Sequence, residues 1–338
     1  MKGKRLLIVG AGGFIGGFIA RKALELGYDT TVAVRESTSR RYLDDPSLKF
    51  LVLDYDSQES MLRAIGQEQQ GWDYVIYNLG ATKCANFLDF NRINFEYLRR
   101  FCTVLTECGK VPEKFLYMSS LSAVGAGDER TYAPISEDVR PNPNTRYGLS
   151  KIKAEQWLEI SSGLPWIIFR PTGVYGPHEK DYLMMIKSID RHFDFGVGFR
   201  RQMITFVYVE DLVEAMFAAL ESAPVGRRYN ISEPRAYSQA EFRRIVAEEL
   251  GGKFVVPLRL PMWAVYAVSA VAEKVAAFSG KASTLNRDKY QIMKQRNWCC
   301  TTDLAARDFG FTARTDLRQG IRKTVAEYLK EKKRKKSE

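Results

Sequence analysis

A tyrosine and a lysine four residues apart, Tyr147 and Lys151, are the side chains in this sequence that are best suited to move a proton. In a helix they lie one turn apart on the same face. A phenol has an ordinary pKa of ~10, and a positive charge beside it favours the ionised form, so such a pair can exchange a proton near neutral pH. The pair therefore predicts acid–base chemistry on a group that the fold brings to it.

The position of this pair is more informative than its spacing. Lysine also follows tyrosine by four residues at Tyr290 and at Tyr328. Only the pair at Tyr147 comes after a strand, predicted at 114–118, that ends in the run Ser119-Ser120-Leu121-Ser122. Because α/β sheets bind ligands at the carboxyl ends of their strands, we expect a serine and the tyrosine to share one site.

A glycine-rich turn near the N-terminus has the spacing of a dinucleotide-binding loop. The apolar residues 6–9 run into Gly10, Gly13 and Gly16, and an apolar pattern with helical spacing follows. These glycines allow a tight turn, a close approach of the backbone to a pyrophosphate, and close packing of the helix on the strand. Unpaired N–H groups at the start of that helix would bind the phosphates. Since a second strand follows at 30–34, the stretch predicts a dinucleotide site.

The residue after the second strand indicates which dinucleotide is preferred. An NAD site usually has an acidic residue there, which accepts a hydrogen bond from the ribose 2′-hydroxyl. This sequence has Arg35, whose cation suits a 2′-phosphate. NADP(H) is therefore favoured, with NAD(H) as the alternative. After a third strand at 50–53, Asp54 could accept a hydrogen bond from the adenine amino group.

Strands and helices alternate from residue 5 to residue 120, which predicts an α/β fold with a doubly wound parallel sheet of the Rossmann type. We expect residues 1–172 and 204–222 to form the dinucleotide-binding domain. The predicted substrate-binding lobe is smaller, C-terminal and mostly helical. It comprises 173–203 and 223–329, and a basic tail follows at 330–338.

Composition and charge limit the function classes. Five cysteines without a CxxC pair and only two histidines favour a reducing, cytoplasmic location and argue against a metal site or a serine-hydrolase triad. The longest later apolar run, 262–272, is too short to span a bilayer. The net charge is +11, and the basic tail could bind nucleic acid or anionic lipid. A solvated end that frays after a helix explains the tail more simply, so we expect no nucleic-acid partner.

The sequence resembles the extended short-chain dehydrogenase/reductase family, also called the NAD-dependent epimerase/dehydratase family, over nearly its whole length. The resemblance is carried, in order, by the glycine turn at 10–16, Asp54, the Ser119-Ser120 strand end, Tyr147-x-x-x-Lys151, the segment 170–177 and the segment 205–212. A looser resemblance, at Pro261-Met262-Trp263, Trp298 and Phe309-Gly310-Phe311, points to the branch that contains 3β-hydroxysteroid dehydrogenases and dihydroflavonol-type reductases.

This resemblance implies Ser120, Tyr147 and Lys151 as the catalytic set, with Asn94 supporting the proton path. Ser120 is preferred to its neighbours because Gly125 then matches the glycine that usually closes the motif. Lys151 would also hold the cofactor ribose. The residues expected at the cofactor are Gly10, Gly13, Phe14, Ile15, Gly16, Arg35, Asp54, Tyr55, Leu79, Gly80, Ala81, Tyr147, Lys151, Pro171, Gly173 and Val174.

The resemblance further implies hydride transfer at a secondary alcohol or ketone of a small molecule, which the looser resemblance makes apolar and steroid- or flavonoid-like. Two alternatives stay open. One is an epimerase of nucleotide sugars, which uses the same residues, and the other is a protein that binds NADP(H) without catalysis. Aromatic residues in 182–199 could line the substrate pocket or pack the smaller lobe. The family also implies a homodimer as an assembly to test.

Overall fold

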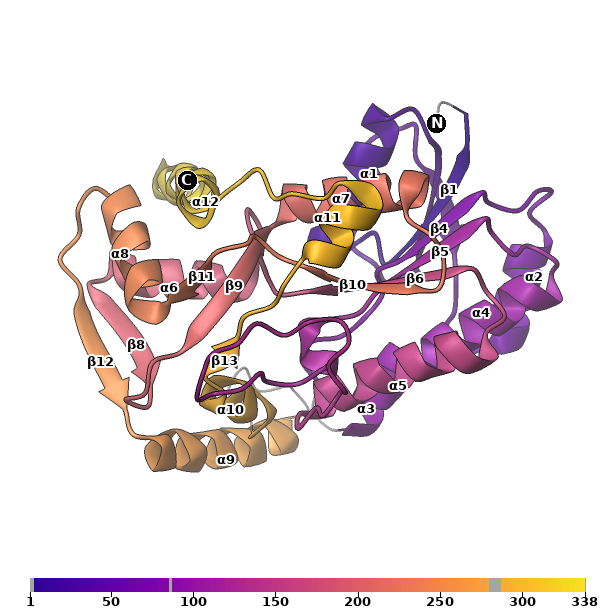
Figure 1. The fold of residues 1–338 in the computed structure, drawn as a ribbon. Coiled ribbons are helices and arrows are strands. Elements are labelled where there is room, and N and C mark those ends of the chain that lie inside the picture. Colours follow the sequence, from indigo (N-terminus) through magenta and orange to yellow (C-terminus); the bar gives the residue numbers. More distant parts are fainter. Residues whose placement is uncertain (1–2, 85–86, 280–286, 338) are drawn as a thin grey trace.

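The computed structural model describes residues 3–84, 87–279 and 287–337. Its largest element is a seven-stranded sheet with the order β10-β6-β5-β4-β1-β2-β3 (Figure 1). All neighbouring strands in it run parallel. The strands are β1 (Arg5–Val9), β2 (Asp29–Val34), β3 (Lys49–Val52), β4 (Tyr74–Tyr77), β5 (Lys114–Met118), β6 (Trp166–Pro171) and β10 (Arg227–Ile231). The predicted doubly wound parallel sheet is confirmed.

Helices cover both faces of this sheet (Figure 1). One face carries α1 (Phe14–Glu25), α7 (Val209–Ser222) and α11 (Asp303–Phe309), and the other carries α2 (Gln58–Gly66), α4 (Tyr97–Glu107) and α5 (Arg146–Ser161). The short helix α3 (Phe87–Asn91) and the π-helix η1 (Arg92–Glu96) lead into α4. Residues 6–9 of β1 alternate between the two cores, so this part of the strand is apolar throughout and buried on both sides.

The smaller lobe combines helices with two small sheets. Strands β7 (Gly173–Tyr175), β9 (Met203–Tyr208), β11 (Ala236–Ser238) and β13 (Asn297–Trp298) form one sheet, and β8 (Phe193–Val197) with β12 (Val256–Leu260) forms the other. The helices are α6 (Lys180–Asp190), α8 (Gln239–Glu249), α9 (Met262–Ser279) and α10 (Arg287–Lys294).

Two strands pair in the sheet of the other domain, not of the one to which the sequence assigned them. The segment 223–329 was expected in the substrate-binding lobe, but β10 pairs with β6 at the edge of the main sheet. The segment 204–222 was expected in the dinucleotide-binding domain, but β9 pairs with β7, β11 and β13 in the smaller lobe. The chain moves from one sheet to the other within two residues, since β6 ends at Pro171 and β7 begins at Gly173.

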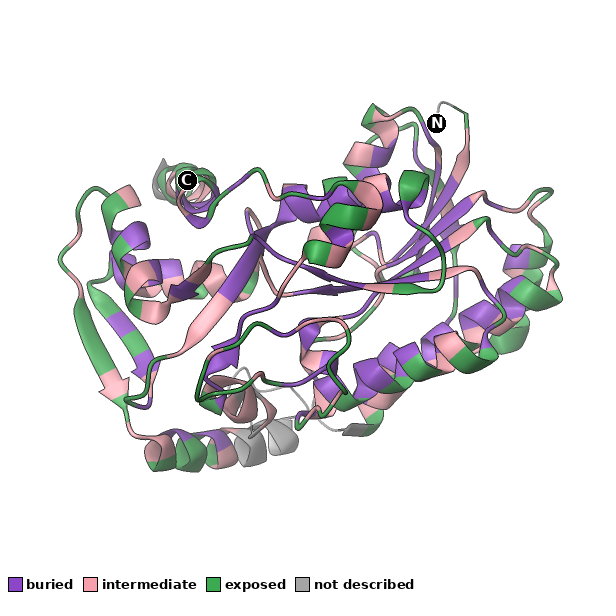
Figure 2. Ribbon diagram, viewed as in Figure 1, coloured by how far each residue is buried: buried purple, intermediate pink, exposed green. Residues whose placement is uncertain are grey.

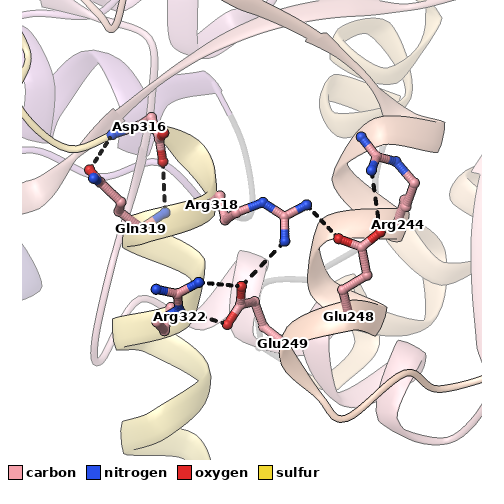
Figure 3. A network of polar contacts seen from close by, with 7 residues as sticks. All are labelled: Arg244, Glu248, Glu249, Asp316, Arg318, Gln319 and Arg322. Carbon is pink, nitrogen blue, oxygen red and sulfur yellow. Dashed lines mark hydrogen bonds and ion pairs between the residues drawn. The ribbon is translucent and has the colours of Figure 1, made fainter.

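The C-terminal segment is helical where a frayed tail was expected. Helix α12 (Leu317–Ser337) includes most of the basic tail, and Lys332 makes an ion pair with Asp190 at the end of α6. Nearer its start, α12 packs on α8 through arginines and glutamates, as Figure 3 shows. Arg322 lies 3.0 Å from Glu249, and Arg318 reaches both Glu248 and Glu249.

Burial follows these layers (Figure 2). The central strands of the main sheet are buried, whereas β12 and part of α9 are exposed. No helix in the described residues is both long enough and apolar enough to cross a membrane.

Candidate active site

The glycine-rich turn has a geometry that only glycine allows. Gly10 has a φ of 86°, and a Cβ atom there would lie 2.7 Å from the backbone nitrogen of Leu79. A Cβ at Gly16 would lie 2.3 Å from the carbonyl oxygen of Gly10. Gly13 is exposed and is the N-cap of α1, with no side-chain hydrogen bond at the cap. The first N–H groups of α1 therefore have no side-chain cap, and N–H groups of this kind at a helix N-terminus can bind phosphate groups.

The residues after β4 lie against the glycine turn, since a Cβ at Gly10 would meet Asn78 and Leu79. Phe14 and Ile15 begin α1 and are half-buried. Leu79, Gly80 and Ala81 follow Asn78, the first residue after β4, at the point where the strand order of the sheet reverses between β1 and β4. Crevices at such reversals are the usual ligand sites of doubly wound sheets. The structure thus brings these predicted residues together with the glycine turn.

The residues predicted at the adenosine end lie at the ends of β2 and β3. Arg35 is exposed, and its backbone N–H donates to Thr38 Oγ1 at 3.0 Å. Asp54 is also exposed, and its Oδ1 accepts a hydrogen bond from the backbone of Asp56 at 3.0 Å. Tyr55 is buried beside them, and its hydroxyl has no hydrogen-bond partner in the structure. A cation, a carboxylate and an unsatisfied hydroxyl are groups that a nucleotide can use.

Tyr147 and Ser120 meet at the ends of two neighbouring elements. Helix α5 begins after Thr145, whose Oγ1 accepts a hydrogen bond from the backbone of Gly148 at 2.9 Å, and this cap places Tyr147 in the first turn. Burial raises the pKa of Tyr147 to about 12, although a hydrogen bond with Ser120 acts to lower it. The sequence predicted that a phenolate would be favoured by a nearby ammonium. In this structure burial raises the pKa of Tyr147 instead, and the stabilisation of a phenolate by the ammonium stays a prediction.

Lys151 lies one turn further along α5 and is buried. Its Nζ donates to the carbonyl oxygen of Met118 at 2.7 Å and lies 4.8 Å from the ring centre of Tyr117. Burial lowers the pKa of Lys151 to about 7, and the Glu155 carboxylate opposes that shift. A Cβ at Gly80 would lie 3.1 Å from Nζ, so the missing side chain of Gly80 leaves the space that this ammonium needs.

Asn94 connects the β4 loop to helix α5. Its Oδ1 accepts from the backbone N–H of Ala81 at 2.7 Å, and its Nδ2 donates to the Ala81 carbonyl at 3.1 Å and to Ser150 Oγ at 2.9 Å. Ser150 Oγ in turn donates to the carbonyl oxygen of Tyr147 at 2.7 Å. Asn94 sits in the π-helix η1, a form often found at functional sites. Its predicted part in proton transfer stays a prediction, and its contacts are those of a positioning residue.

The segment that leaves the main sheet borders the same site. Pro171 ends β6, and Gly173 and Val174 begin β7. Between them, the backbone N–H of Thr172 donates to Ile231 at 3.1 Å, but its hydroxyl is buried without a partner. An unsatisfied hydroxyl of this kind fits a carboxamide such as that of nicotinamide.

Three further residues support the site and were not predicted. Asp288, on α10, accepts hydrogen bonds from the backbone N–H groups of Arg146 at 2.6 Å and Tyr147 at 3.3 Å, so its carboxylate lies at the positive end of α5. The other two residues are Ser150, which accepts a hydrogen bond from Asn94, and Glu155, whose carboxylate opposes the lowering of the Lys151 pKa. The polar residues of α5 could have been suspected from their spacing after Tyr147, whereas Asp288 is too distant in sequence to give any local signal.

Metal chemistry has no visible support in the described residues, which contain no group of three or more histidine, cysteine, aspartate or glutamate side chains placed to hold an ion. The glycine cradle, the unsatisfied hydroxyls and the basic Arg35 instead fit a nicotinamide dinucleotide. A parallel doubly wound sheet with this turn at its reversal point defines a dinucleotide-dependent Rossmann-type enzyme.

The chain belongs to the NAD dependent epimerase/dehydratase family, whose sequence profile matches residues 6–232. The resemblance to extended short-chain dehydrogenases/reductases is thereby confirmed, and the chain is an NAD(P)-dependent enzyme. The match includes Tyr147 and Lys151 and ends just after β10.

Known relatives catalyse different reactions. An ADP-L-glycero-D-manno-heptose-6-epimerase of Nitratidesulfovibrio vulgaris is 26% identical over 255 residues, which cover 68% of this chain and 76% of that protein. A ceramide reductase of Caulobacter vibrioides is 23% identical over 323 residues, or 95% of this chain and 93% of that protein. The solved complex of Thermus thermophilus UDP-glucose 4-epimerase with NAD has the same fold, with a TM-score of 0.76 at 19% identity over 96% of this chain and 99% of that one.

Proposed function

We propose that this enzyme transfers hydride between a nicotinamide cofactor and a secondary alcohol or ketone of an apolar small molecule. The observation that carries the proposal is the arrangement of Ser120, Tyr147 and Lys151 at the carboxyl ends of β5 and β4. A protonated phenol there is hydrogen-bonded to a serine, and a buried ammonium lies one turn away. This is what the reduction of a carbonyl group requires from a protein.

Each of the three residues has a defined task in this proposal. Ser120 hydrogen-bonds the substrate oxygen, and Tyr147 donates its proton to that oxygen as negative charge develops there. Lys151 is fixed by its bond to Met118, so it can hold the cofactor ribose and stabilise the phenolate that Tyr147 leaves behind. The cofactor, when bound, supplies or accepts the hydride.

The proposed cofactor is NADP(H), bound by the predicted residues. The glycine turn would hold the pyrophosphate, Thr172 and the 171–174 segment would lie along the nicotinamide, and Arg35 would contact the 2′-phosphate. Arg35 is exposed at the end of β2, on the edge of the sheet where that phosphate would lie, and this supports NADP(H) over NAD(H).

The surroundings of the reacting groups support an apolar substrate. The ring of Phe90 lies 6.2 Å from that of Tyr147. The short helix η2 (Leu121–Ala123) after Ser120 packs into an apolar cluster with residues of the smaller lobe. Its members are Leu121, Val124, Ile135, Trp298 and Cys300. The similarity to a ceramide reductase along almost the whole chain favours a lipid-like ketone, beside the steroid- and flavonoid-like compounds expected from the sequence.

A second candidate is the epimerisation of a nucleotide sugar. It is favoured by the similarity to a heptose 6-epimerase, and the same three residues could serve it. The two reactions differ in what happens to the cofactor, because a reductase consumes NADPH in every turnover whereas an epimerase regenerates its bound cofactor. The measurement should therefore follow both cofactor and substrate.

The test is an absorbance assay of NADPH with purified enzyme and a panel of steroid, flavonoid and keto-ceramide substrates, with UDP- and ADP-sugars analysed in parallel for inversion. We expect NADPH to be consumed with an apolar ketone. Inversion of a sugar without net loss of cofactor would overturn the reductase proposal. No turnover in either arm, despite tight NADPH binding, would favour a protein that binds the cofactor without catalysis.

A further inference from the structure

A large apolar surface covers the outer edge of the smaller lobe. More than half of the exposed large hydrophobic side chains in the described residues lie in two segments, 193–199 and 254–271. They are Phe193, Phe195, Phe199, Phe254, Val256, Leu258, Leu260, Trp263, Tyr266, Val268 and Val271, here called the apolar face. Single exposed apolar side chains are normal, but a concentration of this kind marks a binding surface.

The two-stranded sheet supplies the first part of the apolar face. Strands β8 and β12 are parallel neighbours, and their register pairs Phe193 with Val256 and Phe195 with Leu258. Side chains alternate along a strand, so these four point to the same side. The intervening Asp194 is buried on the opposite side. One whole side of this sheet is thus apolar and faces solvent. The sequence suggested that these aromatic residues would line a pocket or pack the smaller lobe, and neither description fits this side of the sheet.

Helix α9 extends the apolar face. It follows β12 directly and runs along the lower edge of the lobe in Figure 1, where Figure 2 shows exposed and buried residues alternating in its first turns. Val265 and Ser269 are its buried side, whereas Trp263 is 75% exposed. A helix this rich in apolar residues is normally covered all round. Since α9 does not meet the requirements of a membrane span, its exposed side would be covered by contact with another surface.

The charges beside the apolar face are almost all positive. Within 191–201 and 253–271, five lysine or arginine side chains accompany a single carboxylate, and that carboxylate, Asp194, is buried. Phe199 is 79% exposed and is followed directly by Arg200 and Arg201, which are also exposed. Aromatic rings beside arginines suit a surface in which apolar chains lie beneath anionic groups. There the rings enter the apolar layer while the guanidinium groups bind the phosphates.

We propose that the apolar face docks this enzyme on the surface of an anionic lipid bilayer without crossing it. The charge of the face excludes a basic partner, and its two aromatic-rich segments give the separate anchors that stable interfacial binding needs. Docking would also bring the bilayer near the reaction site, because α9 packs on α10, whose Asp288 binds the backbone at Tyr147. This proposal goes beyond the proposed activity and does not depend on it.

The test is co-sedimentation of the full chain with phosphatidylcholine vesicles, with and without phosphatidylglycerol. We expect binding to the anionic vesicles that weakens with added salt. Trp263→Glu and Phe195→Glu should each weaken that binding at least about tenfold, because each puts a charge into the apolar layer. Ile160→Glu is the matched control, since Ile160 is 83% exposed on α5, outside the apolar face, and this variant should bind as the wild type does.

Three outcomes would overturn the proposal. The first is a wild-type protein that sediments with neither vesicle, and the second is a Trp263→Glu variant that binds as well as Ile160→Glu does. The third is a wild-type dimer, seen by light scattering, that Trp263→Glu dissociates while neither protein binds vesicles, because a second copy of the chain would then cover the apolar face. None of these measurements uses a substrate, so a failed reductase assay would leave the result intact.

Discussion

Glu155 and Arg170 form an ion pair with no solvent exposure on either side chain, directly behind the candidate active site. Nε of Arg170 lies 3.1 Å from both carboxylate oxygens, and Nη2 also donates to Glu155. The same carboxylate accepts a hydrogen bond from Ser119 Oγ. Glu155 is one turn after Lys151 on α5, so this single carboxylate joins β5, β6 and α5 and also supports the charge of the lysine.

Loss of that carboxylate should destabilise the fold strongly. In Glu155→Gln, Arg170 would keep its buried charge without a counter-ion, which costs about 3–5 kcal/mol in comparable cases. Urea unfolding measures the difference. Glu159→Gln is the control on the same helix, because Glu159 pairs with the more exposed Arg228 at 3.3 Å and should cost less than about 1 kcal/mol. Equal losses in the two variants would contradict the importance given to the buried pair.

The buried ammonium of Lys151 should make stability depend on pH. Its pKa is lowered to about 7 in the folded protein, and it returns to ~10.4 when the chain unfolds. Between these values the unfolded chain binds more protons than the folded one, so this group makes stability rise as the pH rises. Below pH ~7 both states are protonated and the penalty is constant.

Lys151→Met removes this dependence and leaves every other titrating group in place. The unfolding free energy of the wild type, minus that of the variant, should therefore increase from pH ~7 to pH ~10. Denaturant titrations of both proteins across that range give the difference. A constant difference would mean that the ammonium is not desolvated.

Gly16 should not tolerate even one methyl group. A Cβ there would lie 2.3 Å from the Gly10 carbonyl and 2.6 Å from Ala11, and both are backbone atoms of the turn. Gly16→Ala should therefore separate α1 from β1 and weaken binding of NADPH, measured by its fluorescence. Gly66→Ala is the control, since a Cβ at Gly66 meets nothing within 4 Å and alanine favours helices by up to about 1 kcal/mol.

The parts of the fold that rest on local patterns could be predicted from the sequence. Apolar runs and glycines that lie close together in the chain indicate three of these parts. They are the strand at 114–118, the helix that carries Tyr147 and the turn at Gly10. Packing then places the strand ends together, because a parallel sheet aligns its carboxyl edges. This is why residues as distant as Gly80 and Lys151 could be expected at one site.

What depends on contacts between distant segments could not be predicted. The exchange of β9 and β10 between the two sheets reflects pairing partners, and a strand pattern does not name its neighbour. The contact of Asp288 with the start of α5 joins residues 141 positions apart. Likewise, the aromatic side chains of β8 have the composition of core residues, and only their exposure in the folded chain shows that the side shared by Phe193 and Phe195 faces outward.

Arg35 should decide the preference for NADPH over NADH. In Arg35→Asp, a carboxylate would repel the 2′-phosphate and could accept a hydrogen bond from the ribose 2′-hydroxyl of NADH. We expect the ratio of NADPH to NADH affinity to fall by at least about tenfold, which corresponds to ~1.4 kcal/mol. Titration of both cofactors measures it. An unchanged ratio would assign the phosphate contact to another side chain.

Tyr147→Phe should separate binding from chemistry. The variant keeps the ring beside Phe90 and the backbone contact with Asp288, so the shape of the site and the affinity for NADPH should be preserved. It lacks the proton that the substrate oxygen must receive, and loss of a positioned general acid typically costs ~10²–10⁴-fold in rate. Burial holds the pKa of Tyr147 near 12, so the phenol stays protonated well above neutral pH, and we expect any loss of reducing activity above pH ~7 to follow the deprotonation of Lys151. Turnover of the variant at the wild-type rate would remove Tyr147 from the reaction, whereas a joint loss of turnover and NADPH affinity would show that its hydroxyl positions the cofactor.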